Sequence, residues 1–113
     1  MMTASEKIGI MGIGMVGAPL ARYFTEVAGY DRSANLFLYD TDKTKKCSDD
    51  MRRADIVFIC VPSPRMRDGS ADISFVGRAI GMLEKSKIVV IKSTVPPGAT
   101  EHFQKQNPRQ LFK

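Results

Sequence analysis

Apolar residues along the chain fall into short uninterrupted runs, which alternate with longer segments of mixed character. The runs read KIGIM, LFLY, IVFICV and IVVI, and they lie at residues 7–11, 36–39, 56–61 and 88–91. A short apolar run that is rich in β-branched residues is typical of a strand buried on both faces of a sheet. The pattern therefore predicts four buried strands.

Three other segments are expected to be helices. The first helix is expected within residues 15–28, and its apolar face carries Val16, Leu20, Tyr23, Phe24 and Val27. The second follows Asp72 as its N-cap, and its apolar positions are Ile73, Val76, Ile80 and Leu83. The third is expected to begin at the Pro96–Pro97 pair, with Ser93 or Thr94 as its cap, and to end near Asn107.

The order of these elements predicts the fold class. Buried strands that alternate with amphipathic helices indicate an α/β protein with a parallel sheet and right-handed crossovers. We expect a Rossmann-type doubly wound sheet of about four strands in the order 2-1-3-4. Residues 41–54 are polar and leave room only for a short helix or a loop. The strand at 88–91 would then form an unpaired apolar edge, which favours homo-oligomerisation through that edge.

Length and composition fit one folded domain. The chain has 113 residues, of which 43% are hydrophobic and 26% charged, so we expect a single domain over residues 1–113. No apolar run approaches the roughly 20 residues that span a bilayer, and the N-terminal sequence lacks the pattern of a secretory signal. We therefore expect a cytoplasmic protein without a membrane partner.

The chain carries a formal net charge of +5, which would suit an anionic partner such as a nucleotide, a nucleotide sugar or a nucleic acid. The basic residues are spread along the chain, as on a solvated surface. A basic nucleic-acid-binding domain is one alternative, but the sequence has no aromatic–basic strand pattern and no recognisable reading helix. We expect no nucleic-acid partner.

A glycine-rich motif follows the first strand directly. It reads GIGMVG at residues 12–17 and matches G-x-G-x-x-G, and it opens the first helix. This context is the one that dinucleotide binding requires. We expect Gly12 to permit a tight turn, Gly14 to let backbone N–H groups approach a pyrophosphate, and Gly17 to allow close packing of the helix on the strand. The helix N-terminus adds a partial positive charge.

Asp40 ends the second strand, 23 residues after Gly17. A carboxylate at this place accepts hydrogen bonds from the hydroxyls of an adenosine ribose and repels a 2′-phosphate, which predicts NAD as the cofactor. The alternative is an aspartate that only begins the turn Asp40-Thr41-Asp42. Basic residues follow that would attract a 2′-phosphate, and we expect them to flank the site without overruling Asp40; they are Lys43, Lys45 and Lys46.

Three longer segments resemble one enzyme family. The segments GIGMVGAPLA, ADIVFICVPSP followed by DGSAD, and IKSTVPPGAT resemble the N-terminal domain of the UDP-glucose/GDP-mannose dehydrogenases. The resemblance covers about residues 6–107, and STVPPG is its most specific piece. It implies an enzyme that oxidises the primary alcohol of a sugar nucleotide to a carboxylate with two NAD molecules. The glycine motif alone also fits 6-phosphogluconate and β-hydroxyacid dehydrogenases, and a stand-alone NAD-binding module is a further alternative.

The resemblance also implies roles for particular residues. The glycine motif would hold the pyrophosphate, Val61, Pro62 and Ser63 would border the adenosine side, and Thr94 would lie near the nicotinamide ribose. Residues 61–63 and Thr94 each lie at the carboxyl end of a predicted strand, at the edge where doubly wound sheets bind ligands. The expected cofactor-binding residues are Gly12, Gly14, Met15, Val16, Gly17, Asp40, Val61, Pro62, Ser63, Ser93 and Thr94.

The sequence departs from the family pattern in two ways. Family members usually have a longer stretch after the second strand, so we expect a truncated sheet. The family's catalytic cysteine, lysine and asparagine lie later than this chain reaches, and Asn107-Pro108 is followed by Arg109 rather than by the family's Glu-Phe. The family's central and C-terminal domains are therefore outside these residues. We expect a chain that binds NAD, is inactive alone and meets a sugar nucleotide only in a longer enzyme.

Other residues with reactive or stacking side chains have simpler explanations. Cys60 lies in an apolar strand and is expected to be a small buried hydrophobe rather than a nucleophile. Cys47 is expected to be a free surface thiol and His102 a solvated side chain. Two separate cysteines exclude a disulfide framework and a paired-cysteine zinc site, and we expect no metal. We assign core or terminus-packing roles to Phe75, Phe103 and Phe112.

Overall fold

The computed structural model describes residues 6–32, 34–83, 87–93 and 95–112. Its strands are β1 (Ile8–Met11), β2 (Leu36–Tyr39), β3 (Ile56–Ile59), β4 (Ile88–Ile91) and β5 (Leu111–Phe112). Its α-helices are α1 (Gly17–Glu26), α2 (Ser74–Gly81) and α3 (Ala99–Gln106). Two short 3₁₀ turns, η1 (Lys43–Lys45) and η2 (Met51–Arg53), occupy the polar stretch after β2.

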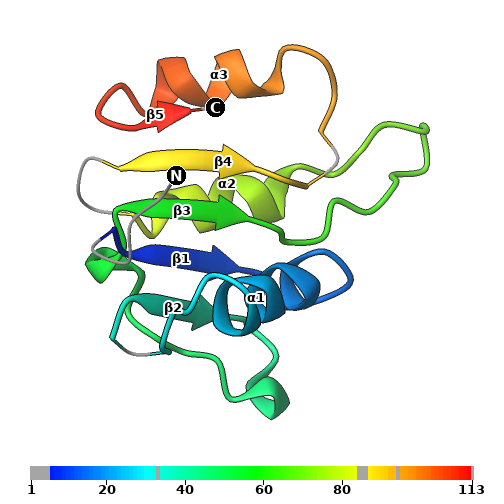
Figure 1. Ribbon diagram of the computed structural model, residues 1–113. Helices are drawn as coiled ribbons and strands as arrows, with labels where there is room; N and C mark the ends of the chain where they lie inside the picture. Colours follow the sequence, from blue (N-terminus) through cyan, green and yellow to red (C-terminus); the bar gives the residue numbers. More distant parts are fainter. Residues whose placement is uncertain (1–5, 33, 84–86, 94, 113) are drawn as a thin grey trace.

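The strands form one parallel sheet in the order β2-β1-β3-β4-β5. In the centre, Ile8 of β1 is in register with Leu36 of β2 on one side and Ile56 of β3 on the other. Helices lie on both faces of this sheet, as Figure 1 shows. The predicted doubly wound α/β fold is confirmed. Within the described residues, no helix has the length and apolar character that crossing a membrane requires.

Each face of the sheet carries its own hydrophobic core. On one face, Ile8 and Ile10 pack with Phe24 of α1 and with Tyr30. On the other face, the core joins strand residues to α2 and α3, and it includes Met11, Phe37, Val57, Ile59, Val76, Ile80, Val89 and Phe103. Because successive strand residues point to opposite faces, a strand between two cores must be apolar throughout.

The predicted apolar face of the first helix is partly wrong. Val16, Tyr23 and Val27 are exposed, and the buried residues of α1 are Gly17, Ala21 and Phe24. The helix begins against the glycine motif, where only a glycine fits, and continues with a small residue one turn later. Because α1 lies so close to the loop, the side of the helix that faces the sheet is narrower than the positions of its large apolar residues predict.

The predicted unpaired edge at residues 88–91 is also wrong. Leu111 and Phe112 form β5, which pairs with Ile88 and Val89 of β4, and Phe112 is buried. Two glutamines hold this strand in place. The Gln104 Oε1 accepts from the Phe112 N–H at 3.1 Å, and the Gln110 Oε1 accepts from the Lys87 N–H at 2.7 Å. The homo-oligomerisation predicted through this edge required an unpaired strand, and the pairing with β5 removes that reason.

Several element boundaries differ slightly from the expected ones. β3 ends at Ile59 rather than Val61. The N-cap of α2 is Ile73 rather than the predicted Asp72, and the Asp72 carboxylate accepts from the Ser74 N–H at 2.9 Å just before the helix. The cap of α3 is Gly98 at a φ of 86°, so Ser93 does not cap this helix. Thr94 lies outside the described residues.

Candidate functional site

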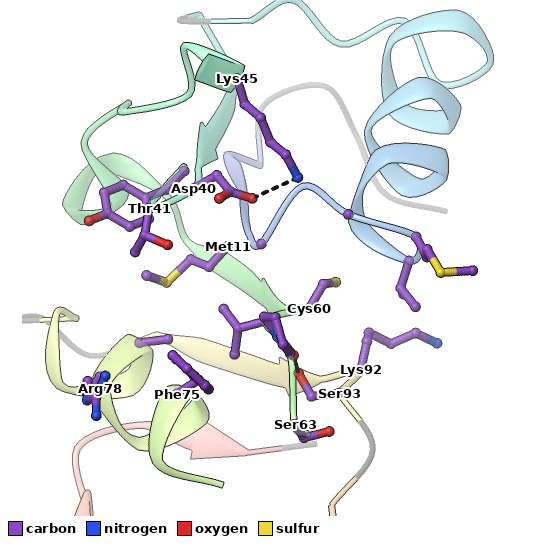
Figure 2. A pocket seen from close by; sticks show the side chains of 18 of the residues that line it. Met11, Asp40, Thr41, Lys45, Cys60, Ser63, Phe75, Arg78, Lys92 and Ser93 are labelled. Carbon is purple, nitrogen blue, oxygen red and sulfur yellow. Dashed lines mark hydrogen bonds and ion pairs between the residues drawn. The ribbon is translucent and has the colours of Figure 1, made fainter. Parts of the chain in front are cut away.

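The carboxyl ends of the parallel strands meet at one edge of the sheet and open into a cleft of about 680 Å³. Figure 2 shows the cleft between the glycine motif and the end of β2 on one side and α2 on the other. The expected site residues that line it are Gly12, Gly14, Met15, Val16, Asp40, Val61, Pro62, Ser63 and Ser93. Gly17 is buried in the first turn of α1.

Two glycines of the motif are required by the fold itself. Gly12 has a φ of 94°, and a Cβ there would lie 2.7 Å from the backbone of Cys60. A Cβ on Gly17 would lie 1.8 Å from the Gly12 carbonyl oxygen. The two residues therefore let the loop pass tightly over the end of β3 and let α1 start against it.

Gly14 differs from both. A Cβ built on Gly14 has no heavy atom within 4 Å apart from its immediate neighbours, its φ lies outside the left-handed region, and the residue is exposed along the cleft. The protein's own packing does not need a glycine here. A group that approaches the loop from the cleft would need one.

The start of α1 is suited to an anion. Val16 is the N-cap and provides no side-chain hydrogen bond, and the first turn has no acidic residue. Backbone N–H groups at a helix start lack partners inside the helix and carry a partial positive charge. At this position they lie beside Gly14, where the loop leaves room for a ligand.

The Asp40 carboxylate joins the end of β2 to the glycine motif. It accepts from the Ile13 N–H at 2.7 Å and from the Asp42 N–H at 2.8 Å. The Lys45 Nζ lies 3.5 Å from its Oδ2 and donates to the Ile13 carbonyl at 2.6 Å. The dashed contact in Figure 2 is this pair of side chains.

These contacts set the charge of Asp40. Burial by itself raises the pKa of the Asp40 carboxyl, but the Asp42 and Ile13 amides and the Lys45 ammonium outweigh it, so the pKa is lowered. The carboxylate is therefore ionised at neutral pH. The turn Asp40-Thr41-Asp42 also forms, because the Asp40 carboxylate accepts from the Asp42 N–H. Of the three nearby lysines, only Lys45 lines the cleft.

The side of the cleft that α2 forms was not predicted from the sequence. Phe75, Arg78 and Ala79 of α2 line it together with Met82, and the core role predicted for Phe75 is wrong because 39% of the residue is exposed. The i, i+3, i+4, i+7 spacing of these four residues was the available signal. The other lining residues outside the predicted set are Met11, Tyr39, Thr41, Lys45, Cys60 and Lys92.

The two cysteines and the histidine, all within the described residues, lie in different surroundings. Cys60 is buried as predicted, and burial raises the pKa of its thiol to about 11 despite the charge of Lys92. Cys47 is buried rather than on the surface, and its thiol donates to the Lys45 carbonyl at 3.3 Å. His102 is exposed, as expected. No group of three potential metal ligands occurs in the part of the chain that the structure describes.

Comparison with known proteins adds a family to this geometry. The sequence profile of the UDP-glucose/GDP-mannose dehydrogenase family, NAD binding domain, matches residues 29–111. UDP-N-acetyl-D-mannosamine dehydrogenase of Pyrococcus horikoshii is 29% identical over 84% of this chain and 30% of its own length. UDP-glucose 6-dehydrogenase of Rickettsia bellii is 32% identical over 74% of this chain and 18% of its own length.

Solved structures share the fold. A UDP-glucose dehydrogenase from Pyrobaculum islandicum matches with a TM-score of 0.73 at 21% identity, over 95% of this chain and 34% of that chain. A GDP-mannose dehydrogenase from Pseudomonas aeruginosa matches with a TM-score of 0.72 at 21% identity, over 84% of this chain and 30% of that chain. The chain therefore spans about a third or less of the length of these relatives.

Proposed function

The chain belongs to the UDP-glucose/GDP-mannose dehydrogenase family as its NAD-binding domain, and we propose that the cleft at the carboxyl edge of the sheet is where it holds NAD. Gly14 carries this assignment. It is the one glycine of the motif whose missing side chain the protein does not need, and it faces the cleft beside the start of α1. A pyrophosphate in contact with this backbone accounts for the glycine.

The arrangement of the cleft supports an assignment for the remaining parts of NAD. The amides that begin α1 would hold the pyrophosphate, Met15 and Val16 being part of that loop. Asp40 would accept from the adenosine ribose, because the carboxylate is ionised and lines the cleft. Lys45 would fix the carboxylate and the loop in one position. The residues that would border the rest of NAD are Val61, Pro62, Ser63, Ser93 and Thr94.

In a longer enzyme this domain would serve the oxidation of a sugar nucleotide, as the names of its relatives indicate. Bound NAD supplies the hydride acceptor for such a reaction. The residues of this chain would bind and orient the cofactor, which contributes to the rate through positioning. A base and a nucleophile would have to come from elsewhere, because the cleft offers neither in a reactive state among the described residues.

A thermal-shift titration with NAD, NADP and UDP-glucose tests this function. A ligand that binds only the folded state raises the unfolding temperature in proportion to the logarithm of its concentration above Kd. We expect a rise with NAD, a smaller one with NADP and none with UDP-glucose. A protein that does not respond to NAD at millimolar concentration would contradict the proposal.

Replacing Asp40 by Ala should weaken NAD binding by roughly 1–3 kcal/mol, the loss of charge-assisted hydrogen bonds. The affinity for NADP should fall less or rise, because the carboxylate that repels its 2′-phosphate is gone. Isothermal titration calorimetry measures both affinities. Asp40→Asn is the matched control, because it keeps an acceptor for the Ile13 N–H while it removes the negative charge. It should change only the ratio of the affinities for NAD and NADP. Equal affinities for both cofactors in the wild type would contradict the ribose assignment.

We expect this chain alone not to oxidise sugar nucleotides. Cys60 is largely buried at the edge of the cleft, and its thiol pKa is about 11, so it is not ionised at neutral pH. His102 is exposed and is not among the cleft residues. The assay is NADH formation from UDP-glucose or GDP-mannose with a high concentration of purified protein. Turnover that persists on repurification and disappears in a Gly14→Val variant would mean that the chain contains a catalytic site of its own.

A further inference from the structure

Met15 is the most exposed methionine among the described residues. Its exposed fraction is 97%, against 51% for Met66 and 42% for Met82. Met11 and Met51 are buried, with exposed fractions of 1% and 3%. A thioether side chain is apolar and usually contributes to a core. Core packing therefore explains Met11 and Met51, and it leaves the position of Met15 unexplained.

The place of Met15 in the fold brings its thioether to the cleft. Met15 lies in the loop that joins β1 to α1 at the carboxyl edge of the sheet (Figure 1), and it lines the cleft. Its neighbours are Gly14, whose Cβ position is open, and Val16, the N-cap of α1. The proposed function assigns both neighbours to the pyrophosphate. An exposed sulfur is therefore attached to the part of the loop that would meet the cofactor.

An exposed thioether allows one reversible reaction at this position. A peroxide transfers one oxygen atom to the Met15 sulfur, its O–O bond breaks, and water or an alcohol leaves, so that the sulfur is oxidised and the peroxide is reduced by two electrons. The product is methionine sulfoxide, which is a polar side chain. A methionine sulfoxide reductase reverses the reaction, because two thiols supply the electrons, form a disulfide and release the oxygen as water.

The cysteines of the domain compete poorly for a peroxide. The thiolate is the reactive form of a cysteine, and both Cys47 and Cys60 are buried. Burial also raises the pKa of the Cys60 thiol to about 11, so little of it is ionised at neutral pH. A thioether has no proton to lose, and its reaction with a peroxide depends on exposure. Met15 is therefore the more accessible target.

We propose that Met15 is a site of reversible oxidation by peroxides, and that its sulfoxide weakens the binding of NAD. The inference rests on the proposed function, because the effect needs a pyrophosphate at the glycine motif. The sulfoxide oxygen carries a partial negative charge, so it would repel the phosphates and compete with them for the N–H groups that begin α1. Reduction of the sulfoxide would restore the affinity.

Peptide mass spectrometry after brief treatment with hydrogen peroxide tests the site. Met11 and Met15 lie four positions apart, and fragment ions assign the added oxygen to one of them. We expect Met15 to be oxidised before Met66 and Met82, while Met11 remains a thioether. Saturating NAD should slow the oxidation of Met15 and leave that of Met66 unchanged. Oxidation of Met11 or Met66 ahead of Met15 would contradict the proposal.

Calorimetric titration with NAD before and after peroxide tests the effect on binding. The oxidised wild type should bind NAD about tenfold more weakly, as loss of a hydrogen bond to a charged group does. Methionine sulfoxide reductase with dithiothreitol should restore the affinity. Met15→Leu has no sulfur at this position, so peroxide should not change its affinity. Met66→Leu is the matched control, because Met66 is exposed but is not among the cleft residues, and peroxide should weaken its binding as in the wild type.

The outcomes separate this inference from the proposed function. If the reduced wild type does not bind NAD, the proposed function fails and the effect on binding fails with it. If the reduced protein binds NAD and keeps its affinity when Met15 is fully oxidised, only this inference is wrong. A peroxide-dependent loss of affinity in Met15→Leu would also overturn it. Circular dichroism of the oxidised wild type should match that of the reduced protein, and a changed spectrum would mean that unfolding causes the loss.

Discussion

A Gly14→Val variant should lose NAD binding by at least about a hundredfold while its fold remains intact, since in this chain open space lies where its Cβ would be. The isopropyl group would occupy the space in which a pyrophosphate meets the loop, and removing that contact together with the helix-start amides costs about 3 kcal/mol or more. Calorimetry measures the affinity, and circular dichroism with urea unfolding measures the fold. A hundredfold loss of affinity without a change in stability is the expected combination.

Gly81→Val provides the matched control for this change. Gly81 also has open space around its Cβ position, but it lies at the end of α2 and is not among the cleft residues. It should bind NAD like the wild type. If both valine variants bound NAD normally, the pyrophosphate would lie elsewhere and the cleft assignment would be wrong.

The Gly17→Ala substitution should do the opposite and disrupt the fold. The added methyl group would lie 1.8 Å from the Gly12 carbonyl oxygen, so either α1 or the loop has to move. Overpacking of this kind costs about 3 kcal/mol or more when backbone is in the way, which is a large part of the stability of a small domain. Urea unfolding monitored by circular dichroism should show an early transition or none.

Gly77→Ala is the comparison that isolates the cause. Gly77 lies inside α2, and its Cβ would lie 3.7 Å from the Phe103 ring, an ordinary contact. Since alanine favours a helix interior by about 1 kcal/mol over glycine, this variant should be as stable as the wild type or more so. A tolerated Gly17→Ala would mean that α1 can slide away from the loop.

The strands could be predicted because their signal is local. A strand between two cores has to be apolar at every position, and the runs at 36–39 and 88–91 match β2 and β4. β5 has only two residues, and Leu111 and Phe112 carry no pattern that would reveal a strand. It is held by side-chain hydrogen bonds of Gln104 and Gln110, and the bond from the Lys87 N–H to Gln110 joins residues 23 positions apart.

In the candidate site, too, some residues could be predicted from a local pattern and others could not. The glycine motif and Asp40 could be placed from spacing alone, because each follows a strand that ends at the cleft. The link from Lys45 to the Ile13 carbonyl spans 32 positions and depends on how η1 folds back, which spacing does not reveal. The cleft residues of α2 were missed for another reason, since a phenylalanine in an amphipathic helix suggests a core position, and the sequence pattern gave Arg78 no role.

The two hydrogen bonds to Ile13 have a consequence for the thermodynamics of binding. Its N–H is fixed by Asp40 and its carbonyl by Lys45, so the middle of the glycine motif is ordered before any ligand arrives. Ordering a flexible loop costs conformational entropy that reduces the net affinity, and a loop held in place avoids this cost. Residues of η1, which lie far from the motif in the sequence, thereby influence binding through the freedom of the unbound loop.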